Sequence, residues 1–123
     1  MPSKDKVIWC DRGWMPFYYG FCPSETAWRK EMKKMGCEGE PYPTGDGRTT
    51  TFERDSELCV IVTVNVREGV SEDAVLGMLV HETVHVKQYL MRHIGESKPS
   101  EEFEAYTMQA IFMCLMDAYA KTR

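Results

Sequence analysis

The sequence lacks several patterns that would place it in a common class. Its five cysteines are an odd number with no CxxC pair, which argues against a disulfide framework and a cysteine-built zinc finger, while a single Cys10–Cys22 bridge stays open. Basic residues number 15 against 19 acidic ones, so no nucleic-acid surface is indicated. No apolar run could span a bilayer, and the polar N-terminal segment does not resemble a secretory signal peptide. We therefore expect free thiols, a cytoplasmic protein, and neither nucleic acid nor membrane as partner.

What is present describes one ordinary globular domain. The chain has 123 residues, of which 43% are hydrophobic and 28% charged. This length supports a real core but not a second one, so residues 1–123 are expected to form a single domain. No internal repeat or low-complexity segment divides it.

The first half predicts a hairpin, a helix and a loop. Two β-prone runs, residues 7–10 and 14–21, are separated by a short turn and are expected to pair. Ser24 is a favourable N-cap for a helix over residues 25–35, which Gly36 ends. Residues 37–48 hold several glycine and proline breaks and predict a long loop.

The second half predicts strands followed by two helices. β-branched residues indicate strands over 49–53 and 58–66, and the second strand has one apolar and one semi-polar face, which suits an edge strand that pairs with a substrate. Ser71 and Ser100 are N-caps for helices ending near Arg92 and Lys121. Apolar residues surround much of the last helix, so we expect it to be packed on more than one side.

The pentapeptide His81-Glu82-Thr83-Val84-His85 carries the clearest chemistry in the chain. It reads HExxH, and on a helix the four-residue spacing places both imidazoles on one face with Glu82 beside the gap between them. Two such histidines can bind zinc, and Glu82 can reach a water molecule on it. A core helix with two coincidental histidines is the alternative, but it would bury polar nitrogens without partners.

A catalytic zinc ion normally has three protein ligands, so a third must come from elsewhere in the chain. The last helix begins with three carboxylates in one turn, at Glu101, Glu102 and Glu104. Acidic residues also favour helix N-termini for electrostatic reasons, which accounts for part of this pattern. Cys59 is another candidate, since peptide deformylases use an upstream cysteine. Its context lacks the glycine of that family, and a core thiol is the preferred interpretation.

The two motifs together resemble the gluzincins, HExxH zinc metallopeptidases whose third ligand is a glutamate on the following helix. The match is closest to small single-domain members, the minigluzincins. Many phages and prophages encode small proteins that look like these. If this chain is phage-encoded, the expected location is the host cytoplasm. Residues 102–105 match the second motif, E-x-x-A, so the resemblance implies Zn²⁺ bound by His81, His85 and Glu102, with Glu101 and Glu104 as alternative ligands. It implies a zincin-like α+β fold, in which a small mixed or antiparallel sheet packs on the active-site helix and a C-terminal ligand helix. Tyr106 replaces an aspartate that in many such families orients a zinc-bound histidine, so this contact is either missing or supplied by another group, such as Glu104 or Gln109.

The resulting hypothesis is a zinc-dependent peptidase acting on peptides or proteins. Glu82 would be the general base, and a tyrosine or His93 would stabilise the oxyanion. The alternative is a catalytically inactive binding protein that keeps the fold and the metal site. The short chain favours this alternative, because little is left for a second cleft wall, whereas the intact HExxH motif argues against it.

Overall fold

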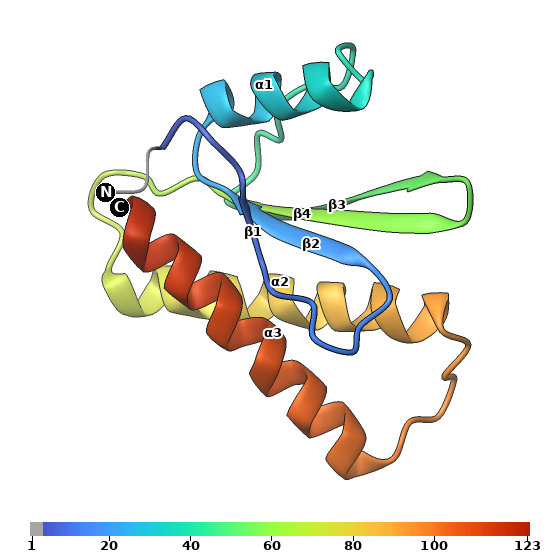
Figure 1. Cartoon of the computed structure of the whole chain (residues 1–123). Coiled ribbons are helices and arrows are strands. Elements are labelled where there is room, and N and C mark those ends of the chain that lie inside the picture. The colour runs from blue at the N-terminus through green and yellow to red at the C-terminus, as the bar shows by residue number, and fades with distance from the viewer. Residues whose placement is uncertain (1–3) are drawn as a thin grey trace.

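Four strands form one mixed sheet in the computed structural model, which describes residues 4–123 (Figure 1). β1 (Ile8–Trp9) pairs antiparallel with β2 (Tyr18–Cys22), and β2 runs parallel to β4 (Glu57–Val64). β3 (Gly47–Arg54) pairs antiparallel with β4. The order is therefore β1-β2-β4-β3, with β3 at one edge.

Helices cover both faces of this sheet. α1 (Glu25–Met35) lies on one face, and α2 (Glu72–His93) and α3 (Glu101–Thr122) lie on the other (Figure 1). Each helix begins after a serine whose hydroxyl accepts a hydrogen bond from a backbone N–H in the first turn, which satisfies one of the unpaired donors there. These serines are Ser24, Ser71 and Ser100.

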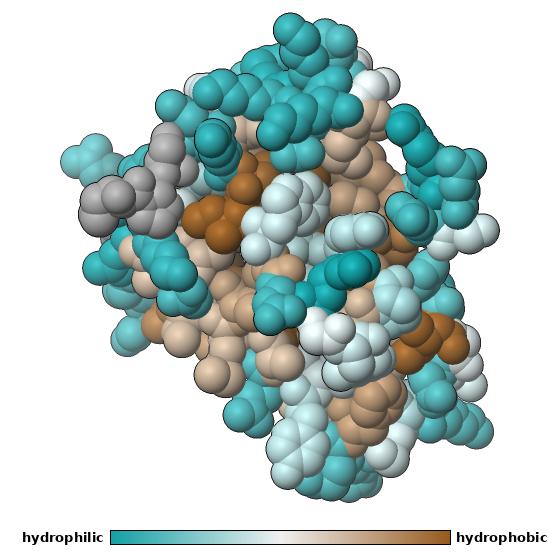
Figure 2. Space-filling view, viewed as in Figure 1, coloured by the Kyte–Doolittle hydropathy of each residue, from teal (hydrophilic) through white to brown (hydrophobic). Residues whose placement is uncertain are grey.

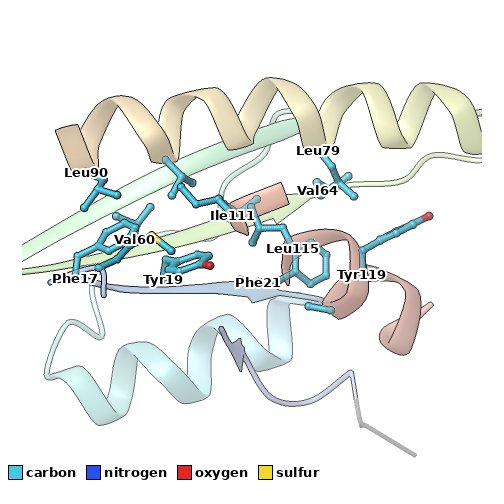
Figure 3. Packing of buried hydrophobic residues seen from close by; sticks show 14 of the residues in the cluster. Phe17, Tyr19, Phe21, Val60, Val64, Leu79, Leu90, Ile111, Leu115 and Tyr119 are labelled. Atoms are coloured by element: carbon cyan, nitrogen blue, oxygen red, sulfur yellow. The ribbon is translucent and has the colours of Figure 1, made fainter. Parts of the chain in front are cut away.

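The main core lies between the sheet and the α2–α3 pair. Alternate residues of β2 and β4 point toward the two helices, with Tyr19 and Val60 fully buried (Figure 3). Leu79 of α2 and Ile111 of α3 meet them from the other side. Burying each such side chain stabilises the fold by about 1.5–3 kcal/mol. A smaller core on the opposite face packs Trp28 and Met32 of α1 against Ile61 and Cys22.

The structure confirms the α+β class with a mixed sheet, the N-terminal hairpin and all three helices close to their predicted bounds. The predicted loop is shorter, because β3 already begins at Gly47. The prediction that the strand over residues 58–66 is an edge strand is wrong. β4 lies between β2 and β3, and α1 covers the face that carries Ile61.

The prediction that the last helix is packed on more than one side is confirmed only in part, because α3 contacts both α2 and β2 but leaves its outer side uncovered. α3 buries one stripe, which includes Ile111 and Leu115, whereas Tyr106 and Met113 on its outer side are exposed. The reason is that α1 lies on the far side of the sheet, so no described element covers the outer side of α3.

The structure also bears on the predictions for the cysteines and for membrane-spanning segments. All five cysteines are free, and Cys10 lies opposite Tyr19 rather than opposite Cys22, so these two do not form a bridge. No helix within residues 4–123 is sufficiently long and apolar to cross a membrane. Residues 1–3, part of the segment judged not to be a signal peptide, lie outside the described residues.

Candidate active site

The HExxH motif lies in the middle of α2 and presents both imidazoles on one side of the helix. The ring centroids of His81 and His85 are 4.9 Å apart. His81 is exposed and His85 is partly buried, while Leu79 and Val86 on the opposite side of the helix enter the core. The apolar residues thus fix the rotation of α2, and this rotation directs the two histidines out of the core.

Glu82 lies between the histidines and the edge strand. One helical position is a rotation of about 100°, which turns Glu82 from the face of His81 toward β3. Its side chain is only 5% exposed, and the Thr49 hydroxyl donates a hydrogen bond of 2.8 Å to Oε1. A Cβ at position 47 would come within 3.0 Å of Oε2, so Gly47 leaves room beside the second oxygen. β3 therefore holds this carboxylate in one orientation.

A groove follows the edge strand past these residues. A cavity of about 450 Å³ is shared by Gly47, His81 and Glu82, and a neighbouring one of about 250 Å³ is lined by the same three residues together with His85 and Tyr89. Tyr89 also lines a third cavity, of about 410 Å³, at the end of α2. In the described sheet β3 has only β4 as a neighbour, so the outer backbone groups of β3 are available along this groove.

The three glutamates of the predicted ligand turn lie elsewhere. Glu101 and Glu102 are exposed at the start of α3, and Glu104 accepts a hydrogen bond of 2.7 Å from Lys87 Nζ. Lys87 is two residues after His85 and is therefore rotated by about 200° from it around α2. None of the three glutamates lines a cavity that contains a histidine of the motif. Across residues 4–123, no group of three His, Cys, Asp or Glu side chains is arranged to hold a metal ion.

The orienting partner of His85 differs from the prediction. Nδ1 of His85 lies 3.0 Å from Oε1 of Gln88, a residue three positions later on the same helix. Glu104 is paired with Lys87, and Gln109 points toward Met113 on α3, so neither contacts a histidine. The i, i+3 spacing of His85 and Gln88 was visible in the sequence. The contact between Thr49 and Glu82 was not, because 33 residues separate them.

The remaining candidate residues divide between the two faces of the sheet. Tyr89 lies one helical turn after His85 and shares its cavity, and His93 lines the next cavity with Tyr89. Cys59 faces α1 on the opposite side of the sheet, so it is separated from the histidines by the sheet itself. Burial raises the pKa of its thiol to about 12, which keeps it neutral and suits the predicted core thiol.

Comparison with known proteins gives no significant match. No protein-family model matches the chain, and no curated protein or solved structure matches it significantly. The site is therefore judged on its own chemistry. Two imidazoles on one exposed helical face suit Zn²⁺, and a held carboxylate beside them suits a general base, whereas the third protein ligand is not assembled with them.

Proposed function

We propose that this chain is a zinc-dependent hydrolase of peptide bonds. The observation that supports it most directly is the position of Glu82. A buried carboxylate lies between two imidazoles and a free strand edge, and it is held there by a threonine of that strand. A carboxylate that served only to stabilise the fold would not need two histidines beside it in the same groove.

His81 and His85 would hold the metal ion through their ring nitrogens, and Gln88 would orient the second ring. The third ligand proposed from the sequence is Glu102, with Glu101 and Glu104 as alternatives. A bound zinc ion would supply the Lewis acidity that lets water act as a nucleophile near neutral pH.

Other residues of the chain would transfer the proton, bind the substrate backbone and stabilise the oxyanion. Thr49 holds Oε1 of Glu82, which leaves Oε2 to take a proton from the attacking water and pass it to the leaving amine. The exposed edge of β3 would pair with an extended substrate backbone, and this replaces the role first assigned to the strand over residues 58–66. Tyr89 is the tyrosine in the histidine cavity, and we propose its hydroxyl as the donor to the oxyanion.

Metal binding is tested first, apart from catalysis. The chelator-treated protein is reloaded with zinc, and its metal content is measured by mass spectrometry in the wild type, His81→Ala and His85→Ala. The control is His93→Ala, which removes the third histidine, a residue that does not line the histidine cavities. We expect about one zinc per chain, lost in the first two variants only. A wild type that cannot be loaded, or equal zinc content in all variants, would refute the site.

The third ligand is tested by changing one glutamate at a time. Glu102→Ala should lower the affinity for zinc far more than Glu101→Ala or Glu104→Ala, because one carboxylate completes the ligand set. Loss of an acidic residue from the first turn of a helix should by itself cost only about 0.3–1 kcal/mol of stability. An equal loss of zinc affinity in all three variants would refute the choice of Glu102, and wild-type affinity in all three would exclude each glutamate as the ligand.

Catalysis is tested with Glu82→Gln on a peptide library. The amide has nearly the same volume as the carboxylate but cannot accept the proton, so a rate contribution of roughly 10²–10⁴ should disappear while zinc content stays unchanged. Full activity in this variant would contradict the role of Glu82. Zinc binding without cleavage by either protein would instead support the binding protein that retains the metal site.

A further inference from the structure

The opposite face of the sheet carries a further, apolar cavity that the proposed hydrolase does not use. Its volume is about 630 Å³, within the range of small-molecule sites. It exists because α1 covers only one end of this face, where Trp28 and Met32 pack on Ile61. Over the rest of this face the cavity is lined by Met35, in the last turn of α1, together with Phe52 and Cys59 of the sheet.

The pairing of the strands explains how this cavity is built. Cys59 lies opposite Tyr18 on β2 and opposite Phe52 on β3, so a small thiol lies between two aromatic rings on one row of the sheet. Trp9 forms a further part of the lining, and Met35 closes the side toward α1. The floor is therefore low and apolar, and aromatic rings form its walls.

Two of these rings are unusually accessible. Trp9 is 41% exposed and Tyr18 is 43% exposed, although both belong to the sheet. Figure 2 shows that hydrophobic residues also reach the surface among hydrophilic ones on the face drawn there. The guanidinium of Arg12 lies 4.1 Å from the centroid of the Tyr18 ring and occupies one face of it, so the exposed Trp9 ring is the better surface for a further cation. Electron-rich rings of this kind favour cationic ligands.

The charges of the lining also favour a cationic ligand. Three carboxylates, those of Glu31, Glu53 and Glu57, line the cavity. Among the described residues of the lining Arg54 is the one cationic side chain, and its guanidinium donates to the carbonyl oxygen of Met35 at 2.9 Å. An aromatic cavity with an acidic lining is complementary to a molecule with an apolar body and a positive charge.

We propose that this cavity binds a small amphiphilic ammonium compound. Its apolar body would lie on Cys59 between Tyr18 and Phe52, and its ammonium group would be near the carboxylates of Glu31 and Glu57. The cavity and the histidine groove lie on opposite faces of the sheet, so this binding is independent of the proposed hydrolase.

The test uses two dyes that share one fluorophore. Dansylcadaverine carries an ammonium group and dansylglycine a carboxylate, and dansyl emission rises in an apolar site. With chelator present, we expect the cationic dye to bind about tenfold more tightly than the anionic one. Glu31→Gln with Glu57→Gln should reduce this ratio severalfold. The matched control, Glu68→Gln with Glu96→Gln, removes the same charge at exposed residues outside the cavity and should preserve the ratio.

A second variant locates the dye. Cys59→Phe fills the cavity floor, so it should abolish dansyl binding in a protein that still melts cooperatively. If this variant fails to fold, the comparison of the two double variants still decides the question. Equal affinity for both dyes, an equal effect of the control pair, or no binding of either dye would overturn the proposal.

Discussion

Replacing Thr49 with valine tests the contact that orients the candidate base. Valine keeps the β-branched shape of threonine and suits a strand, but it removes the hydroxyl that donates to Glu82 Oε1 at 2.8 Å. Glu82 is 5% exposed, so water cannot readily replace the lost donor. A hydrogen bond to a charged group is worth about 1.5–3 kcal/mol, and we expect Thr49→Val to lower the free energy of unfolding by this amount.

This free energy can be converted into a melting temperature. Unfolding entropies of about 2.1 cal/mol/K per residue give about 0.26 kcal/mol/K for a chain of 123 residues. The expected fall in Tm is therefore about 6–12 °C, measurable by circular dichroism, with urea unfolding as a second measurement. Thr49→Ser keeps the donor and should recover most of the loss.

The matched control is Thr51→Val, which makes the same change on the same face of β3. Thr51 is exposed and lies two residues further along β3, so its replacement should change Tm by little. The effects of Thr49→Val and Glu82→Gln on stability should also be non-additive, because the two side chains share one contact. Equal Tm values for Thr49→Val and Thr51→Val would refute the structural role of this hydrogen bond.

Three further changes test other parts of the structure. Gly47→Ala places a Cβ 3.0 Å from Glu82 Oε2, so it should displace the carboxylate and reduce any peptidase rate while Tm changes little. A fall in Tm with an unchanged peptidase rate would count against the assigned position of Glu82. Burial raises the pKa of Cys59 from 9.0 to about 12, so the neutral thiol favours the folded state up to about pH 9, and this contribution is lost as the pH rises toward 12. Urea unfolding at several pH values should then show a smaller alkaline loss of stability in Cys59→Ala, and identical profiles would refute the shift. Lys87→Met removes the ion pair with Glu104 and should raise the affinity for zinc about fivefold or more if the ligand turn becomes free to move, as measured by chelator competition; unchanged affinity would show that the pair does not restrain that turn.

Local signals predicted the elements of this fold well. The serine caps and the Gly36 stop located the helices, and the HExxH spacing located both histidines on one side of α2. These features depend on residues close in sequence, where the 3.6-residue period and cap chemistry suffice. The contact of Thr49 with Glu82 could not be predicted in this way, because it depends on the sheet order.

The position of β4 shows why strand composition did not predict the sheet order. Thr63 and Cys59 made one face of this strand look semi-polar, and a semi-polar face suits an exposed edge. In the structure α1 returns over that face, so Thr63 is fully buried and β4 has neighbours on both sides. Whether a helix covers a face is a long-range property, and the sequence of the strand alone does not contain it.

The ligand turn presents the same difficulty at the level of a helix. Acidic residues at the start of α3 can be identified from the sequence, but their position depends on which side of α2 the third helix occupies. Ile111 and Leu115 hold α3 against the core, and Lys87, with its side chain only 15% exposed, fixes Glu104 on that side. Moving a glutamate to the histidines would require α3 to pivot at its first turns while its apolar stripe stays in place. The half-buried Lys87–Glu104 pair opposes such a pivot. Whether the metal site can be completed in this chain therefore depends on how α3 packs.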